Sequence, residues 1–493
     1  MTTRPDFARL PVLAVTAAYA VVLLAFSGRY DLFGDELYFL AAGQHLDWGY
    51  ADQGPLAPLL ALVMDSLFPG SLTALRLPTA LLTVAGTAVA ALIARELGGG
   101  ARAQVVTAVV FAGAPVMISG GHLLGTGAAD TLAWELAVLV LLRWLHTRRD
   151  VLLLWLGVVT AFAWQAKFLM VGFWAVLLVC ALVFGPRELL RRPMLWLGAG
   201  IAVLATVPAL LWQARHGWPQ LGMTGQIAAE AATGTGGALG FVPIMLFGAG
   251  LLTGAVLVVY GTWRLLRGPQ WRPYAFLGWT FLGLVLVFLV VGGRPYYVNG
   301  LFPLLWAVGA IEVERRVAAR WWRWAAAWPV AVASALAMLF LALPVQPVER
   351  AAARDSADFT SVYSTSWTEL ADQVAAAYHR LPPEQRARTA VLTVTYWQAG
   401  ALDRYGPERG LPRAYSGSRG YWYFGAPPES ADTVLFAGPA VPYLTESFAQ
   451  VQQLSTMDTR LKSNLLVQDV PLQLATGRTG SWAELWPRFQ KLG

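Results

Sequence analysis

Apolar segments of membrane length occupy most of the first two thirds of the chain. A window of about 19 residues identifies segments at 10–27, 75–97, 103–119, 131–146, 151–165, 168–184, 194–213, 241–262, 274–292, 298–312 and 324–344. A backbone surrounded by lipid can satisfy its polar groups within such a segment only as a helix. Hydrophobic residues make up 57% of the chain and charged residues 13%, which is too apolar for an ordinary soluble domain. We predict an α-helical polytopic membrane protein with about 11 transmembrane helices.

Arginines are distributed unequally between the loops that join these segments. If the N-terminus is cytoplasmic, the inner loops hold most of them, and the outer loops hold only a few cations, namely Arg29, Lys167, Arg215 and Arg294. The positive-inside rule therefore predicts a multi-pass protein of the plasma membrane with a cytoplasmic N-terminus. The first segment lacks a small-residue cleavage site, so we expect it to be retained as a span. The arginines form no single basic face, which argues against nucleic-acid binding.

The last third of the chain has a different composition. Residues 345–493 carry mixed charges, a helical pattern from Trp367 to His379 and apolar runs no longer than a strand, such as Ala390 to Val394. This pattern predicts a small α/β domain. Because an odd number of spans precedes it, the domain should be extracytoplasmic. We therefore divide the chain into a transmembrane domain, 1–344, and an extracytoplasmic α/β domain, 345–493.

Two of the predicted outer loops are long. The first, 28–74, contains helical patterns at 35–46 and 56–68, and we expect two helices lying along the outer membrane surface. The second, 214–240, is rich in glycine, and we expect a mobile flap there.

Carboxylates in the outer loops are the first candidates for chemistry. Asp35 and Glu36 follow the first span, and a charge at the edge of a membrane is costly to keep, so both are functional candidates. Their structural alternative is helix capping and a favourable interaction with the helix dipole. Neighbouring helical residues do not share a face, so at most one of the two should point into a given site. Asp130, just before the fourth span, has the same two explanations.

Cations occur at two places on the same predicted side. Lys167, one of only three lysines in the chain, lies at the hinge between two short apolar segments. A lysine that snorkels to the interface is the structural alternative. Arg294 precedes Tyr296 and Tyr297, where an interfacial belt of tyrosines with one anchoring cation is the alternative.

Further polar and aromatic residues on this side are candidates for contacts with an acceptor or a sugar. They are Asp52, Gln53, His122, His216 and Trp218. The histidines match no metal-ligand spacing, and the chain lacks Asp-x-Asp, the P-loop motif and the dinucleotide-binding glycine motif. We therefore predict no cofactor, while a divalent metal stays open.

Carboxylates, cations and aromatic rings on one face suit a particular chemistry. A carboxylate can activate a hydroxyl acceptor as a general base. Cations can hold a departing phosphate, and aromatic rings can pack on a sugar. Together they indicate glycosyl transfer from a phosphate-linked donor. A donor carried in the membrane as a polyprenyl phosphate requires neither of the missing nucleotide motifs.

Seven short motifs occur in a characteristic order along residues 10–320. They are Gly34–Tyr38, Asp52–Leu56, Leu75–Pro78, Ala129–Asp130, Gln165–Phe168, Trp212–Pro219 and Gly293–Tyr297. In this order they resemble the C-type integral-membrane glycosyltransferases. The resemblance is to a bacterial member of the branch that includes the dolichyl-phosphate-mannose protein mannosyltransferases and the lipid A aminoarabinose transferase.

The resemblance implies an inverting transfer of a mannose-type or pentose-type sugar from a polyprenyl-phosphate carrier to an acceptor hydroxyl on the outer face. The acceptor would be a glycan, lipid, protein or natural product. Asp35 would be the base, Glu36 its neighbour in the acceptor site and Asp130 the second-loop acid. Lys167 and Arg294 would contact the donor phosphate, with Tyr296 or Tyr297 nearby. Many relatives have lysine where this chain has Arg294, which keeps the charge but alters the geometry.

Two other functions remain open at this stage. A transporter or lipid flippase for a polyprenyl-linked or glycolipid substrate would also carry charges near the membrane, but it should show internal repeats and polar residues at the midplane. The sequence shows no convincing repeat, and its polar residues gather on one face. A scaffold that displays residues 345–493 would leave the loop acids and Lys167 unexplained.

Overall fold

The computed structural model describes residues 4–234, 236–316, 318–352 and 359–493. The chain divides into two units. The first consists of Met1–Ser27, Gln53–Leu56 and Arg76–Leu343, and the second of Gly28–Asp52, Ala57–Leu75 and Pro344–Gly493. Most of the first outer loop, which the sequence places in the transmembrane domain, thus groups with the C-terminal residues.

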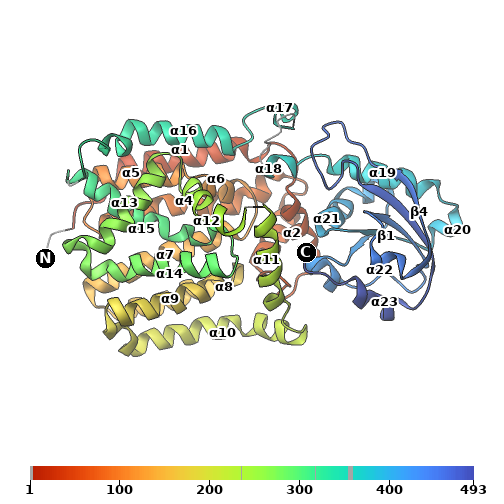
Figure 1. Cartoon of the computed structure of the whole chain (residues 1–493), viewed down its shortest axis with the longest axis horizontal. Helices are drawn as coiled ribbons and strands as arrows, with labels where there is room; N and C mark the ends of the chain where they lie inside the picture. The colour runs from red at the N-terminus through yellow and green to blue at the C-terminus, as the bar shows by residue number, and fades with distance from the viewer. Residues whose placement is uncertain (1–3, 235, 317, 353–358) are drawn as a thin grey trace. The chain divides into compact units, whose positions relative to one another are not determined.

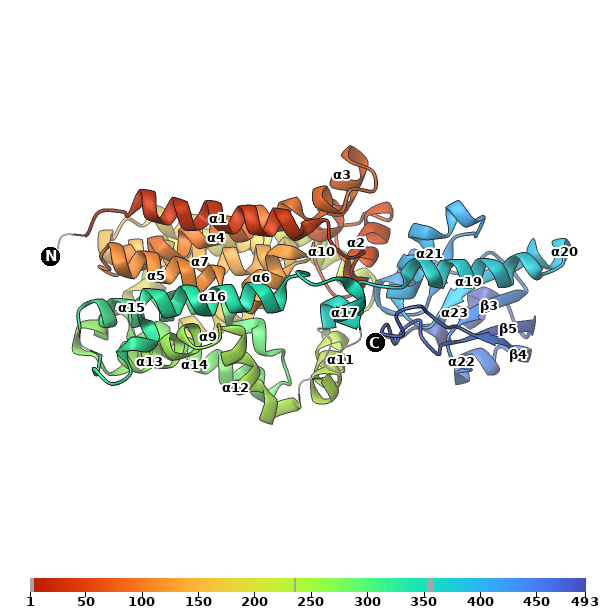
Figure 2. The ribbon, with the colours of Figure 1, turned by 90° about the horizontal axis from the view of Figure 1, so that it is seen from above.

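The first unit is helical (Figures 1 and 2). Its α-helices are α1 (Arg9–Ser27), α4 (Leu72–Glu96), α5 (Ala101–Ala112), α6 (Pro115–His122), α7 (Gly127–Thr147), α8 (Val151–Ala166), α9 (Leu169–Phe184), α10 (Pro193–Arg215), α11 (Pro219–Gly234), α12 (Gly237–Gly248), α13 (Thr253–Arg267), α14 (Ala275–Val290), α15 (Phe302–Glu314) and α16 (Trp328–Ala342). Short 3-10 helices are η1 (Arg187–Arg191), η2 (Pro269–Tyr274), η3 (Pro295–Leu301) and η4 (Arg323–Ala326).

Several of these helices can cross a membrane. Within the described residues, five helices are long and apolar enough, and there are up to seven spans if each of two bent helix pairs is one span. Other predicted segments form shorter apolar helices, among them α8, α9 and α16. The prediction of a helical multi-pass membrane protein is confirmed.

Two predicted spans are interrupted. The segment predicted at 103–119 bends by 60° between α5 and α6. Gly113 ends α5 and Pro115 begins α6, and proline favours the first turn of a new helix. A Cβ on Gly113 would lie 2.4 Å from the Cα of Ala335 in α16, so this glycine also lets α16 pack closely (Figure 2). The segment predicted at 241–262 is divided into α12 and α13 around Gly250, which has a φ of +118°.

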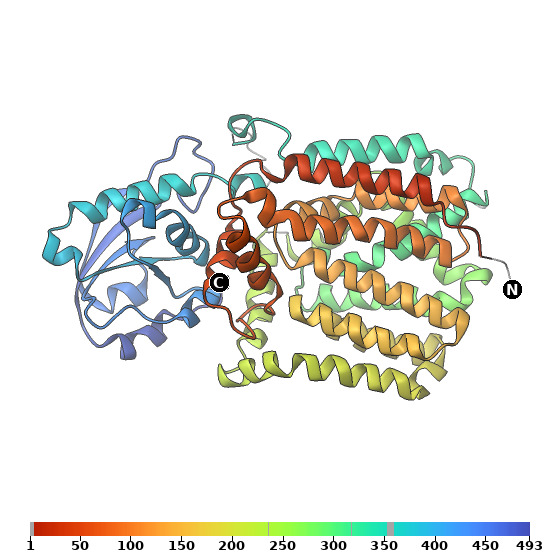
Figure 3. The same cartoon turned by 180° about the vertical axis from the view of Figure 1, so that it is seen from behind.

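The outer loop predicted at 214–240 contains helix α11, which is followed after the break by α12. Thr235 lies outside the described residues. Helix α10, which leads into this loop, packs along α8, as Figure 3 shows. Gly157 and Gly198 allow the close approach, because a Cβ on Gly157 would lie 2.2 Å from the carbonyl oxygen of Gly198.

The second unit holds a mixed five-stranded sheet in the order β2-β1-β3-β5-β4. Its strands are β1 (Thr389–Thr393), β2 (Ala414–Ser416), β3 (Thr433–Ala437), β4 (Phe448–Thr456) and β5 (Pro471–Arg478). β1 is parallel to β2 and β3, and β5 is antiparallel to β3 and β4. The expected α/β fold of the C-terminal residues is confirmed.

Helices cover both faces of this sheet (Figure 1). They are α19 (Trp367–Arg380) and α21 (Tyr396–Tyr405) on one face, and α22 (Pro442–Thr445) and α23 (Trp482–Phe489) on the other. The unit also contains α2 (Gly34–Gln44), α3 (Leu56–Leu67), α17 (Val348–Ala352), α18 (Phe359–Val362), α20 (Pro383–Arg386), η5 (Pro407–Arg409) and η6 (Arg419–Phe424). The two helices predicted in the first loop are therefore present as α2 and α3.

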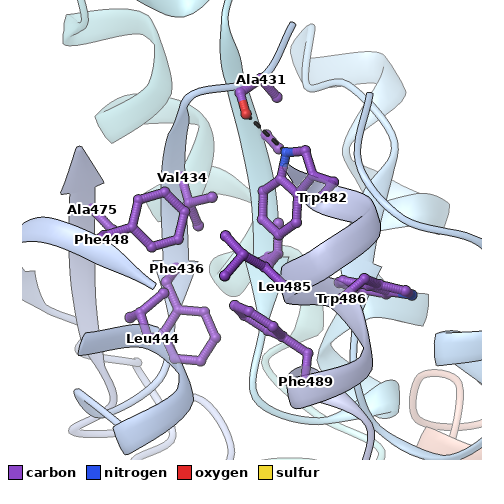
Figure 4. Packing of buried hydrophobic residues seen from close by; sticks show 12 residues of the cluster. Ala431, Val434, Phe436, Leu444, Phe448, Ala475, Trp482, Leu485, Trp486 and Phe489 are labelled. Carbon is purple, nitrogen blue, oxygen red and sulfur yellow. Dashed lines mark hydrogen bonds between the residues drawn. The ribbon is translucent and has the colours of Figure 1, made fainter. Parts of the chain in front are cut away.

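Aromatic side chains of α23 form a core with the sheet (Figure 4). Trp482 is buried, and its indole N–H donates a hydrogen bond of 2.8 Å to the carbonyl oxygen of Ala431. Its ring packs against Phe448 and Phe489. A buried indole needs such a partner for its N–H. This core fixes β1 and β3, and β1 leads directly into α21.

Helix α2 packs tightly on α21 within the second unit. A Cβ on Gly34 would lie 2.1 Å from the Trp397 ring, and a Cβ on Gly400 would lie 2.9 Å from the carbonyl carbon of Leu37. The absence of side chains at both glycines lets the two helices approach. This contact places Asp35 of α2 next to the first turn of α21.

We expect Gly34→Ala to destabilise the second unit by about 1–3 kcal/mol, because the new methyl group forces the Trp397 ring to move. Gly172→Ala in α9 is the matched control, since a Cβ there meets nothing within 4 Å. Thermal unfolding of the purified protein measures both. Equal unfolding temperatures for the two variants would contradict the packing argument.

Candidate active site

The predicted site residues form two groups, one in each unit. In the first unit, Lys167 follows α8, and its Nζ lies 5.5 Å from the ring centroids of both Tyr296 and Tyr297 on η3. The two tyrosine rings meet edge to face, with centroids 5.1 Å apart. A cation over aromatic faces is stabilised by the ring quadrupoles. The ammonium group is thus held at the end of α8.

Asp130 belongs to the same group. It lies in the first turn of α7, is buried, and accepts a hydrogen bond of 3.2 Å from the indole N–H of Trp134. Lys167 is close enough to act on its carboxylate electrostatically. The next residue, Thr131, donates a hydrogen bond of 3.3 Å to Asn299 on η3. These contacts bring together the start of α7, the end of α8 and η3.

Arg294 precedes η3, and its guanidinium donates a short hydrogen bond to the Glu230 carboxylate on α11. Both side chains are partly exposed. Glu230 also accepts a hydrogen bond of 3.2 Å from Gln226. Arg294 is therefore paired with a carboxylate of α11, whereas the sequence predicts that it contacts a phosphate.

Gln53 lies beside the end of α8. The backbone N–H of the following residue, Gly54, donates to the carbonyl oxygen of Ala166 over 3.4 Å. A Cβ on Gly54 would lie 2.3 Å from the carbonyl oxygen of Gln165, so only glycine fits there. The Gln53 side chain is buried, and its Nε2 has no hydrogen-bond partner among the described residues. Such a donor is suited to a polar ligand.

In the second unit, Asp35 lies near the start of α2 and is partly exposed. Its Oδ1 accepts two hydrogen bonds, one of 2.8 Å from the indole N–H of Trp397 and one of 3.1 Å from the phenol of Tyr396. Within the described part of the chain, no hydrogen bond reaches Oδ2. One carboxylate oxygen is thus fixed and the other is open.

Tyr396 is suited to remain a donor. Its side chain is buried, and burial raises the pKa of its phenol well above the ordinary value, with the nearby charge of Asp35 acting in the same direction. The phenol therefore keeps its proton at neutral pH. Arg419 lies over the Tyr396 ring, 4.7 Å from its centroid.

Asp52 continues this network. Its Oδ1 accepts a hydrogen bond of 3.0 Å from Tyr38, and its Oδ2 lies 3.9 Å from the Arg419 guanidinium. Burial raises the pKa of Asp52, while the positive charge of Arg419 opposes that shift. Asp52 and Asp35 thus share one hydrogen-bonded aromatic cluster.

Glu36 is placed differently from Asp35. It is fully buried, and its Oε2 accepts a hydrogen bond of 2.9 Å from the backbone N–H of Phe33, the residue before the helix. The two neighbouring acids therefore point to different surroundings, as expected for adjacent helical positions.

The remaining predicted residues lie at helix ends of the first unit. His122 ends α6, is buried, and is close enough to Arg76 to interact electrostatically. The His216 ring forms a hydrogen bond of 2.7 Å with the carbonyl oxygen of Trp212 and stacks on that indole, so it closes α10. Trp218 follows with a φ of +57° and is exposed. Among the described residues, no group of three or more His, Cys, Asp or Glu side chains could hold a metal ion.

The fold and part of the sequence match known proteins. Residues 52–212 match the family model described as dolichyl-phosphate-mannose-protein mannosyltransferase. The structure is similar to that of ArnT from Cupriavidus metallidurans in the apo state, with a TM-score of 0.61, 15% identity, and coverage of 94% of this chain and 97% of that one. The ArnT structure bound to undecaprenyl phosphate matches with a TM-score of 0.59, 18% identity and the same coverage of 94% and 97%. The comparison with curated protein sequences finds no match.

The chain has the C-type membrane glycosyltransferase fold. This confirms the fold and the resemblance that the seven motifs predict. The C-type fold carries the Lys167 group on its helical unit and the Asp35 group on its second unit.

Sequence reasoning missed four residues of these two groups: Tyr396, Trp397, Arg419 and Glu230. Tyr396 and Trp397 are adjacent aromatic residues directly after a predicted strand, which is a position where functional side chains often lie. Their position after the strand could have identified Tyr396 and Trp397 as candidates, but it does not indicate which carboxylate accepts their hydrogen bonds. The sequence around Glu230 contains no motif that would have identified this residue as part of a site.

Proposed function

We propose that the protein is an inverting glycosyltransferase of the plasma membrane. It transfers one sugar from a polyprenyl-phosphate carrier to an acceptor hydroxyl on the outer face, with its N-terminus cytoplasmic and its α/β domain extracytoplasmic. The observation that carries the proposal is Asp35, whose Oδ1 is held by two donors while Oδ2 is open. This is the arrangement that a general base requires.

In the proposed reaction, the acceptor hydroxyl gives its proton to Asp35, and its oxygen bonds to the anomeric carbon. The bond from that carbon to the phosphate oxygen breaks, and the polyprenyl phosphate leaves with the electron pair. Attack opposite the leaving group inverts the anomeric centre. Lys167 and Arg294 stabilise the negative charge on the leaving phosphate, and Tyr296 and Tyr297 hold the ammonium group in place.

The other predicted residues have supporting roles in this proposal. Glu36 fixes the start of α2, and Asp130 orients Lys167 by its charge. Gln53 offers the donor its Nε2, which has no hydrogen-bond partner among the described residues, and Asp52 lies close to the acceptor. The remaining predicted residues, His122, His216 and Trp218, would shape the outer ends of the helices around the sugar. The name of the matching family model favours a mannose-type sugar over a pentose.

Incubation with a panel of polyprenyl-phosphate sugars tests the proposal. The purified protein should release undecaprenyl phosphate from at least one of them, and mass spectrometry should detect the free or transferred sugar. Boiled protein controls for chemical hydrolysis. Turnover of none of the donors, together with movement of a polyprenyl-linked lipid across vesicle membranes, would instead indicate a flippase.

The pairing of Arg294 with Glu230 leads to a prediction about donor binding. If Arg294 must leave Glu230 to reach the phosphate, Glu230→Gln should bind undecaprenyl phosphate about 10-fold more tightly, because a charge-assisted hydrogen bond no longer competes. Titration calorimetry in detergent measures the affinity. Glu408→Gln, at an exposed surface position, is the control. Unchanged or weaker binding by Glu230→Gln would contradict this role.

A further inference from the structure

Residues of the C-terminal domain reach the carboxylate that we propose as the base. Asp35 is on α2, in the first outer loop, whereas Tyr396 and Trp397 form the first turn of α21, 361 and 362 residues later in the chain. Both donate to the same oxygen, Oδ1. Two neutral donors on one oxygen restrict the rotation of the carboxylate and direct Oδ2 away from them.

The surroundings of Trp397 are built for this contact. Its helix begins with a capping box, in which Thr395 and Gln398 exchange hydrogen bonds. The indole ring lies edge-on to Phe33, with centroids 5.2 Å apart, and it also contacts Tyr363 at 5.2 Å. Gly34 leaves the space that the ring occupies. The indole is thus held by its own helix, by two rings and by a glycine that directly precedes Asp35.

Tyr396 is held by a separate set of contacts. Its ring packs edge to face on Tyr38, with centroids 5.0 Å apart, and the Arg419 guanidinium lies over its face. Tyr38 and Arg419 are in turn joined through Asp52. The donors to Asp35 therefore have little freedom to turn away.

We propose that Tyr396 and Trp397 are positioning residues for the base, so that the C-terminal domain completes the catalytic site. The inference rests on the proposed function. The two donors hold Oδ1, and Oδ2 takes the proton of the acceptor hydroxyl as the new bond to the anomeric carbon forms. The phosphate departs with the electron pair of the broken bond. Neither aromatic residue touches the reacting atoms, and both act through Asp35.

The test compares two nucleophiles that differ in their need for a base. Water must lose a proton as it attacks the anomeric carbon, whereas azide attacks as an anion and loses none. The donor is the polyprenyl-phosphate sugar that the wild-type protein turns over, and the measured quantity is the release of undecaprenyl phosphate with water or with added sodium azide. Trp397→Phe removes the indole N–H and keeps an aromatic ring.

We expect Trp397→Phe to slow the reaction with water about 10-fold. The loss is smaller than the whole contribution of a general base, about 10²- to 10⁴-fold, because Asp35 itself remains. The KM for the donor should stay unchanged, and the rate with azide should fall less than about twofold, so the ratio of azide to water rates rises. Tyr396→Phe should behave in the same way, and the double variant should be slower than either. Trp422→Phe is the matched control, because that indole N–H donates to the carbonyl oxygen of Trp486 and not to Asp35.

Three results separate the possible failures. Wild-type rates with water in both single variants would overturn the positioning role and leave the proposed function intact. An equal loss with water and azide would show that Trp397 acts only through folding, which also overturns the inference. If the wild-type protein turns over no donor at all, the proposed function fails and the inference fails with it.

Discussion

Asp35→Asn should lose glycosyl transfer by at least about 10²-fold, because a positioned general base contributes about 10²- to 10⁴-fold. The substituted amide keeps an oxygen that can accept from Tyr396 and Trp397, so the packing of α2 on α21 should persist. What is lost is the ability to take a proton. Release of undecaprenyl phosphate from the active donor measures the rate.

Asp432→Asn serves as the control for this variant, because that aspartate pairs with Arg388 at the protein surface. Thermal unfolding of both variants verifies that they are folded. Near-normal turnover by a folded Asp35→Asn protein would remove Asp35 as the base, and with it the role of its two donors.

Lys167→Met should reduce donor turnover by about 10²- to 10³-fold, the effect of removing one charge-stabilising group from a catalytic site. Methionine has a length similar to that of lysine and can still pack on Tyr296 and Tyr297, but it carries no charge to meet the leaving phosphate. Affinity for undecaprenyl phosphate should fall as well, since phosphate is present in both substrate and product. Turnover and titration calorimetry measure the two effects.

Lys462→Met is the matched control, since it changes another of the three lysines, in the C-terminal domain. It should leave donor affinity and turnover as in the wild type. If Lys167→Met retained full affinity for undecaprenyl phosphate, the lysine would serve only to anchor the helix end at the membrane surface.

The helices of this protein could be predicted from local sequence, because hydrophobic segments and turn residues are local signals. The bend between α5 and α6 was missed, although Gly113 and Pro115 mark it. A window that averages hydropathy passes over such a break. The same averaging joined α12 and α13 into one predicted span.

The predicted site depended on contacts that local patterns do not encode. Lys167 was linked to Tyr296 and Tyr297 through the family resemblance, and the structure brings these three together. The partners of Asp35 could not be predicted, because they are more than three hundred residues away in the chain. Hydrophobic periodicity identifies buried faces but does not pair them across such a distance.

The second unit is built from segments near the N-terminus and from the C-terminal residues, and this has a consequence for biogenesis. Helix α2 packs on α21, so the segment that carries Asp35 cannot reach its final surroundings until residues 361 positions later have been synthesised. At about 5–20 residues per second, this interval is about 20 to 70 s. During that time the chain from α3 to α19 is synthesised, while the Asp35 carboxylate still lacks its two donors. Interruption of synthesis after α16 would therefore leave the proposed base without the two side chains that hold its Oδ1.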